Sequence, residues 1–180
     1  MKIYNIKIRF ITDYLQHRFT EDAKKELEEW VSKGIVPTTE DEWRASLYID
    51  ESGIFIPAVQ IKKSLEFAGK EFKHKKKRSH IQQWVISNLT VQPLRIYINK
   101  FEPDKIETSY PKRKDGNRVK LQHPAFNAGL EIEFQINNLD DEMEDKTTEN
   151  LVKTAGHMYG IGARRKDMFG RFELVEFKKL

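Results

Sequence analysis

The sequence predicts a single α+β domain whose core follows the order strand, helix, strand, strand, helix, strand. Three observations support this prediction. Apolar and polar residues alternate near the start of the chain, before residue 140 and at the end, as in half-buried strands. Apolar residues at helical spacing occur after residue 57 and after residue 147. The resulting order is that of a ferredoxin-like core, to which two stretches are added as insertions.

The first strand is expected at residues 2 to 10. Its apolar residues all fall on one side: Tyr4, Ile6, Ile8 and Phe10. The polar residues Lys7 and Arg9 fall on the other side, which is the pattern of a half-buried strand. The first insertion, at about residues 12 to 55, separates this strand from the first core helix.

The insertion is expected to hold a helix and a hairpin arm. Thr20 can cap a helix that runs to about Ser32. Its apolar stripe and the residues that end it are Ala23, Leu27, Trp30 and Val31, then Gly34 and Pro37. A short strand or hairpin arm is expected at residues 44 to 49, turned by residues 50 to 53.

The first core helix should begin at Pro57, because proline suits the first turn of a helix. Its inward-facing residues are Ile61, Leu65, Ala68 and Phe72. Two apolar segments follow, at residues 81 to 89 and 94 to 98. The second segment alternates as a core strand does, with Leu94, Ile96 and Ile98 on one side.

A hairpin at about residues 106 to 121 is the second insertion. Asp115 and Gly116 give the strongest short turn signal in the chain. Because the arms are basic and have little to bury, the hairpin should project from the body, between the two middle strands. The remaining elements, in order, are a strand at 130 to 136, an acidic loop at 140 to 145, a helix at 148 to 155 and a strand at 172 to 177.

The composition describes a charged protein that is long enough for a core. The chain has 180 residues, of which 33% are charged and 38% hydrophobic. No apolar run approaches the roughly 18 to 20 residues of a membrane-spanning helix, and the start reads as a strand rather than a signal peptide. The absence of cysteine excludes disulfides, thiolate zinc sites and cysteine nucleophiles. A cytoplasmic location is expected.

Clustering of the cations indicates a polyanionic partner more strongly than the net charge of +4 does. One cluster lies at residues 70 to 78 and another at residues 112 to 114, whereas acids gather at residues 140 to 145. A solvated charged face is the plainer interpretation of such runs. In the predicted topology Lys7 and Arg9 lie opposite Glu131 and Glu133, so salt bridges explain these two cations better than RNA contact does.

The segment from Gly156 to Phe172 joins the last helix to the last strand. It contains four of the nine glycines in the chain, around a cationic triplet. Glycine permits close backbone approach, and turn amides beside arginines suit a phosphate group. The spacing is equally compatible with a tight connection that carries solvated arginines.

Two motifs resemble those of the RAMP proteins, the repeat-associated RNA-binding superfamily of CRISPR systems. Residues 55 to 65, Phe-Ile-Pro-Ala-Val-Gln-Ile-Lys-Lys-Ser-Leu, resemble the entry to the first helix, although Ala58, Val59 and Gln60 replace its Gly-Ser-Ser. Residues 160 to 172 look like the glycine-rich loop before the last strand. The resemblance implies a ferredoxin-like (RRM-like) palm, and a thumb such as the hairpin at 106 to 121. The chain is thus expected to be one RAMP-like domain over residues 1 to 180, similar to a solitary backbone-type subunit, for example from a virus or mobile element.

The function that follows is binding of single-stranded nucleic acid through its sugar-phosphate backbone, with RNA favoured and DNA left as an alternative. The expected partners are this strand and, by self-association along it or with other CRISPR-type subunits, further protein chains. No membrane partner and no cofactor are expected. The expected contact residues are Gly160, Gly162, Arg164, Arg165, Lys166 and Arg171 in the loop, Lys73, Lys75, Lys76, Lys77 and Arg78 in the first basic run, Lys112, Arg113, Lys114 and Arg118 in the hairpin, and the stacking residues Tyr110 and Tyr159.

Catalysis is less favoured than binding, and no catalytic or metal site is assigned. The resemblance makes His157 or His17 a candidate general acid or base of a metal-independent RNA endonuclease. It also makes Asp13, in the loop after the first strand, a candidate for target cleavage, although a lone aspartate there is ordinarily a turn former. A third alternative is a protein-binding module or an inhibitor that mimics a CRISPR backbone subunit. The acids at 140 to 145 lack the register of a calcium loop.

Overall fold

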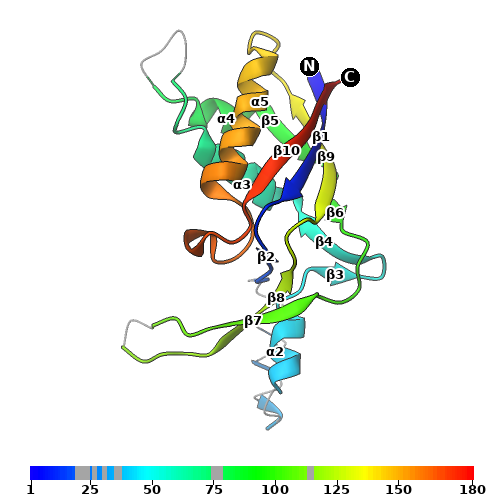
Figure 1. The fold of residues 1–180 in the computed structure, drawn as a ribbon, viewed down its shortest axis with the longest axis vertical. Helices are drawn as coiled ribbons and strands as arrows, with labels where there is room; N and C mark the ends of the chain where they lie inside the picture. Colours follow the sequence, from blue (N-terminus) through cyan, green and yellow to red (C-terminus); the bar gives the residue numbers. More distant parts are fainter. Residues whose placement is uncertain (19–24, 26–27, 30–31, 35–37, 74–78, 113–115) are drawn as a thin grey trace.

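The computed structural model describes residues 1 to 18, 25, 28 to 29, 32 to 34, 38 to 73, 79 to 112 and 116 to 180. Within these residues the chain forms a mixed α+β fold (Figure 1). The strands are β1 (Lys2–Phe10), β2 (Tyr14–Leu15), β3 (Ile49–Asp50), β4 (Gly53–Pro57), β5 (Leu89–Gln92), β6 (Arg95–Tyr97), β7 (Lys105–Ser109), β8 (Leu121–Phe126), β9 (Glu131–Asn138) and β10 (Phe172–Lys179). The helices are α2 (Thr39–Ala45), α3 (Ala58–Ala68), α4 (Gln82–Asn88) and α5 (Asp145–Thr154), followed by the short turns η1 (Ala155–Tyr159) and η2 (Arg165–Asp167).

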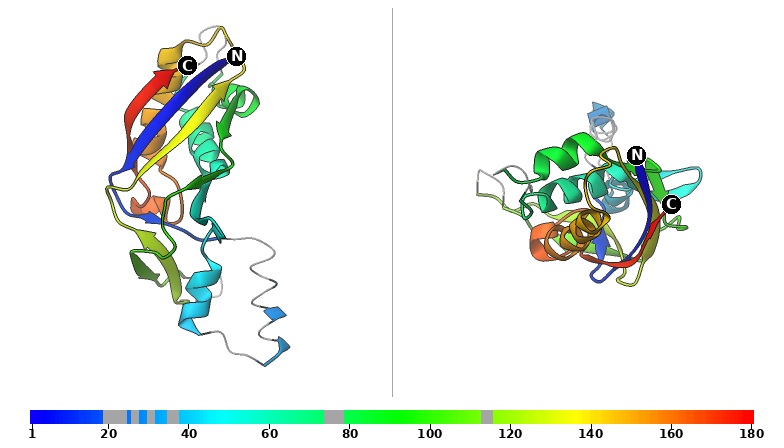
Figure 2. Two further views of the ribbon diagram at one scale, coloured as in Figure 1. Left: turned by 90° about the vertical axis from the view of Figure 1, so that its right-hand side faces the viewer. Right: turned by 90° about the horizontal axis from the view of Figure 1, so that it is seen from above.

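The main sheet has four strands in the order β10-β1-β9-β5, all antiparallel to their neighbours. Helices α3, α4 and α5 lie on one face of this sheet, and Figure 2 shows no described helix on the other face. β1 is central and pairs with β9, as the sequence predicted. The sheet therefore brings the beginning and the end of the chain side by side.

The core lies between the sheet and its helices. Alternate residues of β1 point into it, and Tyr4, Ile6, Ile8 and Phe10 are each at most 1% exposed. The predicted inward face of α3 is confirmed, since Ile61, Leu65 and Ala68 are buried against the same core. Each fully buried large apolar side chain contributes about 1.5 to 3 kcal/mol to folding. The core thus holds the sheet and both long helices in fixed positions.

Two small sheets extend below the main one in Figure 1. One has the order β3-β4-β6, and the other has the order β2-β8-β7. β7 and β8 form an antiparallel hairpin that projects from the body, as expected for residues 106 to 121 (Figure 1). The ladder runs from the Lys105–Ala125 pair to the Ser109–Leu121 pair, and Lys112 faces Arg118 further out. The predicted turn residue Asp115 lies outside the described residues.

The expected hairpin arm at residues 44 to 49 is wrong in its extent, because Arg44 and Ala45 belong to α2. The predicted turn at residues 50 to 53 is confirmed, since Ile49 and Asp50 form β3 and pair with Ile54 and Gly53 of β4. Thr38 starts this helix with a reciprocal cap: its Oγ1 accepts a hydrogen bond from the Asp41 amide at 3.2 Å, and the Asp41 carboxylate accepts one from the Thr38 amide at 2.9 Å. Arg44 lies one helical turn from Glu40 and pairs with it at 3.0 Å. Most of the helix expected between Thr20 and Ser32, including its whole apolar stripe, lies outside the described residues.

The second core strand along the chain is β5, not the expected segment at residues 94 to 98. Leu89 and Val91 point inward from β5, which pairs with β9. Pro93 has no amide hydrogen and cannot extend the ladder, and Leu94 beyond it is 78% exposed. β6 instead pairs with β4, and its Ile96 is buried. None of the helices that the structure describes has the length and apolar character needed to cross a membrane.

Candidate nucleic-acid interface

The glycines of the loop between α5 and β10 are required by close packing within the protein. Gly160, Gly162 and Gly170 have φ values of 65°, 86° and 69°, which a side chain disfavours. A Cβ atom at Gly162 would lie 2.4 Å from the Leu15 carbonyl oxygen, and one at Gly170 would lie 1.8 Å from that of Ile161. The loop therefore presses directly on the chain segment after β1.

The loop amides are largely used by the protein itself. The amide of Gly160 donates to the Ala155 carbonyl, that of Ala163 to the Leu15 carbonyl, and that of Gly170 to the Asp13 carbonyl, each at 2.8 Å. The expectation that the amide of Gly160 helps to hold a phosphate is therefore wrong. These three amides therefore do not contribute to anion binding at the loop.

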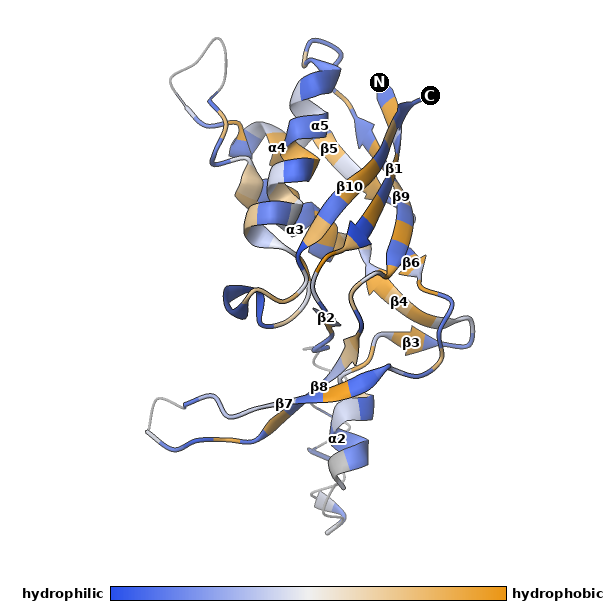
Figure 3. Ribbon diagram, viewed as in Figure 1, coloured by the Kyte–Doolittle hydropathy of each residue, from blue (hydrophilic) through white to orange (hydrophobic). Residues whose placement is uncertain are grey.

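The cations of the loop differ in how they are held. The guanidinium of Arg164 lies 4.9 Å from the centre of the Phe169 ring, and its Nε donates to Asp167 at 3.0 Å. Arg165 lies 5.5 Å from the centre of the Phe67 ring, and Lys166 is exposed. Aromatic support of this kind orients a guanidinium without neutralising it. Asp167 at 3.0 Å and Glu107 at 3.9 Å partly offset the charge of Arg164. Arg164 and Arg165 are thus presented in defined directions. The loop around η2 is strongly hydrophilic in Figure 3.

Arg171 is buried, unlike the other cations of the loop. It is 8% exposed, and its Nη2 donates to the Arg165 carbonyl at 3.2 Å. Its Nε and Nη1 are buried with no hydrogen-bond partner among the described residues. Burial, with the nearby charge of Arg165, lowers its pKa. Arg171 is therefore not an open contact of the surface, although the sequence placed it with Arg164 and Arg165.

A cavity of about 750 Å³ lies where the loop meets the hairpin and the start of α3. We call this cavity the groove. The loop contributes Arg164 and Arg165 to its wall, the hairpin contributes Tyr110, and α3 contributes Gln60 and Lys63. Tyr110 is 57% exposed, so its ring is available for stacking. The groove brings together the two sequence motifs and the hairpin, which lie far apart in the sequence.

Two histidines lie at the groove, and the sequence singled out only one of them. The rings of His17 and His123 lie 5.2 Å apart, edge to face, and Ser109 Oγ lies 3.2 Å from His123 Nε2. Burial, together with the charges of His17 and Arg164, lowers the pKa of His123 to about 4, and burial also lowers the pKa of His17. Both rings are therefore neutral at pH 7, and the lowered pKa makes each a weak base. The sequence carries no local signal for His123, because its burial depends on the strand pairing.

The other catalytic candidates lie outside the groove or are engaged in structure. Asp13 accepts a hydrogen bond from the Ala128 amide at 3.0 Å and pairs with Lys105 at 2.5 Å. Burial alone would raise its pKa, but these two partners outweigh burial and lower the pKa. His157 is exposed on η1, away from the residues that line the groove. The structure therefore assembles no acid–base pair from the three candidates.

The remaining expected contacts are dispersed. The ring of Tyr159 stacks on Phe67 at 5.9 Å, and its hydroxyl hydrogen-bonds to Glu71, which raises its pKa to about 12. Lys73 pairs by its backbone with His80 at the foot of the loop after α3. Lys112 and Arg118 are exposed on the hairpin arms. Six expected contacts lie outside the described residues: Lys75, Lys76, Lys77, Arg78, Arg113 and Lys114.

The open face of the main sheet is neutralised by its own charges. Lys7 pairs with Glu131 at 3.0 Å and with Glu133 at 3.3 Å. Arg9 pairs with Glu131 at 2.7 Å and with Glu173 at 3.4 Å. The predicted salt bridges across β1 and β9 are thus confirmed, and β10 adds a further carboxylate. This face offers a polyanion little net attraction.

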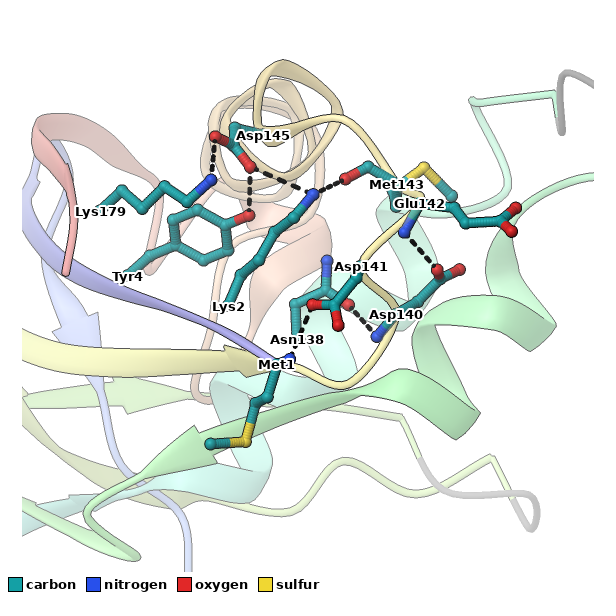
Figure 4. A network of polar contacts seen from close by, with 10 residues as sticks. All are labelled: Met1, Lys2, Tyr4, Asn138, Asp140, Asp141, Glu142, Met143, Asp145 and Lys179. Atoms are coloured by element: carbon teal, nitrogen blue, oxygen red, sulfur yellow. Dashed lines mark hydrogen bonds and ion pairs between the residues drawn. The ribbon is translucent and has the colours of Figure 1, made fainter.

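The acidic loop between β9 and α5 is also bound to its surroundings, at the end of the sheet opposite the hairpin (Figures 1 and 4). Asp145 accepts hydrogen bonds from Tyr4 and Lys179, each at 2.8 Å, and lies 3.4 Å from Lys2. The contact from Lys179, followed by that from Tyr4, lowers the pKa of Asp145 to about 2. Burial, followed by the contact with Asp145, raises the pKa of Tyr4 to about 12. The acids therefore fasten the loop to β1 and β10.

Comparison with solved structures identifies the class of fold: it is that of RAMP-type subunits of CRISPR complexes. Over 99% of its length the chain is similar to a chain of the type III-B Cmr-β complex bound to cognate target RNA, with a TM-score of 0.60 and 15% identity. It spans only 60% of that chain. Similarity to a type IV-B CRISPR complex covers 98% of this chain and 90% of that one, with a TM-score of 0.51 and 10% identity.

A further similar structure is Cmr6 from Pyrococcus furiosus, with a TM-score of 0.50 and 10% identity over 97% of this chain and 98% of that one. No protein-family model matches the sequence, and no curated protein matches it. At these identities the similarity concerns the fold. At that level it confirms the resemblance to RAMP proteins that the two sequence motifs indicated.

Proposed function

We propose that the protein is a RAMP-like, CRISPR-associated RNA-binding protein that holds a single strand in the groove. The observation that carries this proposal is the convergence of Arg164 and Arg165 with the exposed ring of Tyr110 around one open cavity of about 750 Å³. Cations along a groove hold the phosphates of a single strand, and an aromatic ring stacks on its bases. Lys63 on α3 adds a third cation to the same wall.

The topology supports assigning the core to the ferredoxin-like class. The sheet order β10-β1-β9-β5 places the first and third core strands at the centre, and α3 and α5 follow these two strands in the chain. A four-stranded antiparallel sheet with two helices on one face is the palm expected from the resemblance. Its open face is occupied by ion pairs, so we assign the strand to the groove beside the palm.

The hairpin is proposed to extend the contact surface beyond the groove. Lys112 and Arg118 lie on facing arms of the hairpin and are exposed, and Tyr110 links them to the groove. Contacts of this kind are made to the sugar-phosphate backbone and not to the bases, so the affinity for the strand should be mostly electrostatic. RNA is favoured over DNA by analogy with the type III-B complex, which is bound to target RNA. Neighbouring copies or other CRISPR-type subunits along the same strand are the proposed protein partners.

The decisive experiment removes two loop cations and follows binding as a function of salt. Arg164→Ala with Arg165→Ala should weaken binding to a labelled single-stranded RNA in fluorescence anisotropy. Each phosphate contact contributes about −0.7 to the slope of log affinity against log salt. If both arginines contact phosphates, the slope should become flatter by roughly 1 to 1.5.

The matched control is Lys7→Ala with Arg9→Ala, which removes the same charge from the ion-paired face of the sheet. This control should leave the slope within about 0.3 of that of the parent protein. A DNA strand of the same sequence tests the preference for RNA. Equal slopes for the parent and the loop variant would show that the groove does not hold the strand.

A further inference from the structure

Arg171 is a buried cation, and the described residues supply no anionic partner for it. No carboxylate of the described residues forms an ion pair with it within 4.0 Å, and its guanidinium reaches only the Arg165 carbonyl at 3.2 Å and the Met168 sulfur at 3.7 Å among these residues. Nε and Nη1 lie on different edges of the guanidinium, and both are without a partner among the described residues. Burying an unpaired charge is costly, so buried cations are ordinarily paired. Within the described residues, the buried charge of Arg171 is therefore not balanced by an anion.

The surroundings of Arg171 add to the positive charge. A second cavity of about 250 Å³ lies between α3, η1 and η2, and it is lined by Phe67, Met158, Tyr159, Arg165, Lys166 and Arg171. Three of these six residues are cations and none is an acid. Asp167, the acid of the same turn, is bound to Arg164. Glu71 accepts the hydroxyl hydrogen of Tyr159, one of the lining residues.

We propose that this second cavity binds a phosphate group, with Arg171 as its buried cation and Arg165 and Lys166 as its accessible cations. Guanidinium groups form charge-assisted hydrogen bonds with phosphate oxygens, and Nε and Nη1 of Arg171 have no partner among the described residues. The two unpaired nitrogens are covered, so Arg171 contributes its charge while Lys166 and Arg165 make the accessible contacts. The phosphate can come from the end of a nucleic-acid strand or from a free phosphate ion. Binding here does not depend on a strand in the groove.

The first test measures thermal unfolding of the full chain in sodium phosphate and in sodium chloride at equal ionic strength and pH. A ligand at about 100 times its dissociation constant raises the ratio of folded to unfolded protein about 100-fold. The parent protein should show such a gain in stability in phosphate relative to chloride, which we call the phosphate-specific gain. Phosphate also stabilises proteins in general by exclusion from their surface, so variants are needed to isolate the site.

Arg171→Met keeps the volume of the side chain and removes its charge, and the phosphate-specific gain should fall at least about tenfold. Lys178→Met, which removes an exposed charge from β10, should keep the full gain. If Arg171→Met does not fold, Arg165→Met with Lys166→Met removes the accessible cations and should give the same loss. Lys63→Ala, which removes a groove cation that does not line the second cavity, should leave the gain unchanged, so failure of the groove and failure of this site are separate results.

The two sources of phosphate are distinguished with an RNA oligonucleotide that carries either a 5′-phosphate or a 5′-hydroxyl. Tighter binding of the phosphorylated strand by the parent, abolished in Arg171→Met, assigns the site to a strand end. Equal binding of both strands, together with stabilisation by inorganic phosphate, assigns it to the free ion. A phosphate gain that is no larger in the parent than in Arg171→Met overturns the proposal.

Discussion

Shortening the hairpin beyond the β7–β8 ladder should leave the protein folded and weaken its binding to nucleic acid. The change deletes Pro111 to Lys120 and inserts Asn-Gly after Tyr110, which forms a tight connection between paired strands. The outermost ladder pair, Ser109 with Leu121, is kept. Tyr110 also stays, so the groove keeps its exposed ring.

The effect on stability should be small because two modest terms oppose each other. The described residues of the deleted segment are exposed except for the half-buried Val119, whose amide donates to the Pro111 carbonyl. Loss of one exposed hydrogen bond costs about 1 kcal/mol. A loop about four times shorter lowers the entropy of closure by about 1 kcal/mol. The free energy of unfolding should therefore stay within about 1 kcal/mol of the parent value.

Binding should respond much more than stability. The deleted segment contains five cations and one acid, and removing one phosphate interaction flattens the salt dependence by about 0.7. Urea unfolding measures the stability, and salt-titrated anisotropy on single-stranded RNA measures the binding. Absence of a cooperative unfolding transition would show that the outer hairpin belongs to the core. Unchanged binding with an intact fold would refute its role as a binding surface.

Two further predictions concern the loop and the groove. Gly162→Ala should destabilise the protein by at least about 2 kcal/mol, because its Cβ would lie 2.4 Å from the Leu15 oxygen. The control is Gly129→Ala, since Gly129 has a similar φ of 93° and a Cβ there would have no atom within 4 Å. Equal melting temperatures for the two variants would contradict the packing argument. The depressed pKa of His123, about 4 when folded against 6.5 when unfolded, means that the unfolded chain binds the extra proton. Stability should therefore be lost as pH falls from 6.5 towards 4, by up to about 3 kcal/mol. In His123→Gln, the loss of stability at low pH should be smaller, as measured by urea unfolding at several pH values. Identical dependence of stability on pH in the parent and the variant would contradict this prediction.

The sequence predicted the elements whose signals are local. β1 and β9 were readable because each alternates along its whole length and each has one buried face. The inward face of α3 followed from helical spacing. The ion pairs of Lys7 and Arg9 followed once the pairing of these two strands was assumed. In all three cases the signal and its structural result lie in the same element or in adjacent strands.

Other features depend on contacts that no local pattern reveals. Residues 89 to 92 and 95 to 97 are both short and alternate buried with exposed residues, and only their pairing with β9 or β4 decides which enters the main sheet. The glycine loop was readable as a motif, but the acceptors of its amides come from residues 13 to 15 and Ala155. The burial of Arg171 and His123 likewise results from packing between distant segments. A sequence shows that these residues are charged or polar but not what faces them.

Asp13 has a consequence for how mutational scans of this protein are interpreted. Its carboxylate joins the segment after β1 to Lys105 at the start of the hairpin and to Ala128 before β9, while its carbonyl accepts the amide of Gly170. Replacing Asp13 would loosen the base of the hairpin and the segment before β9 together. A loss of activity in such a variant could result from displacement of the groove. It would therefore not by itself show that this aspartate takes part in a chemical step. Only variants that preserve the three attachments can separate chemistry from placement.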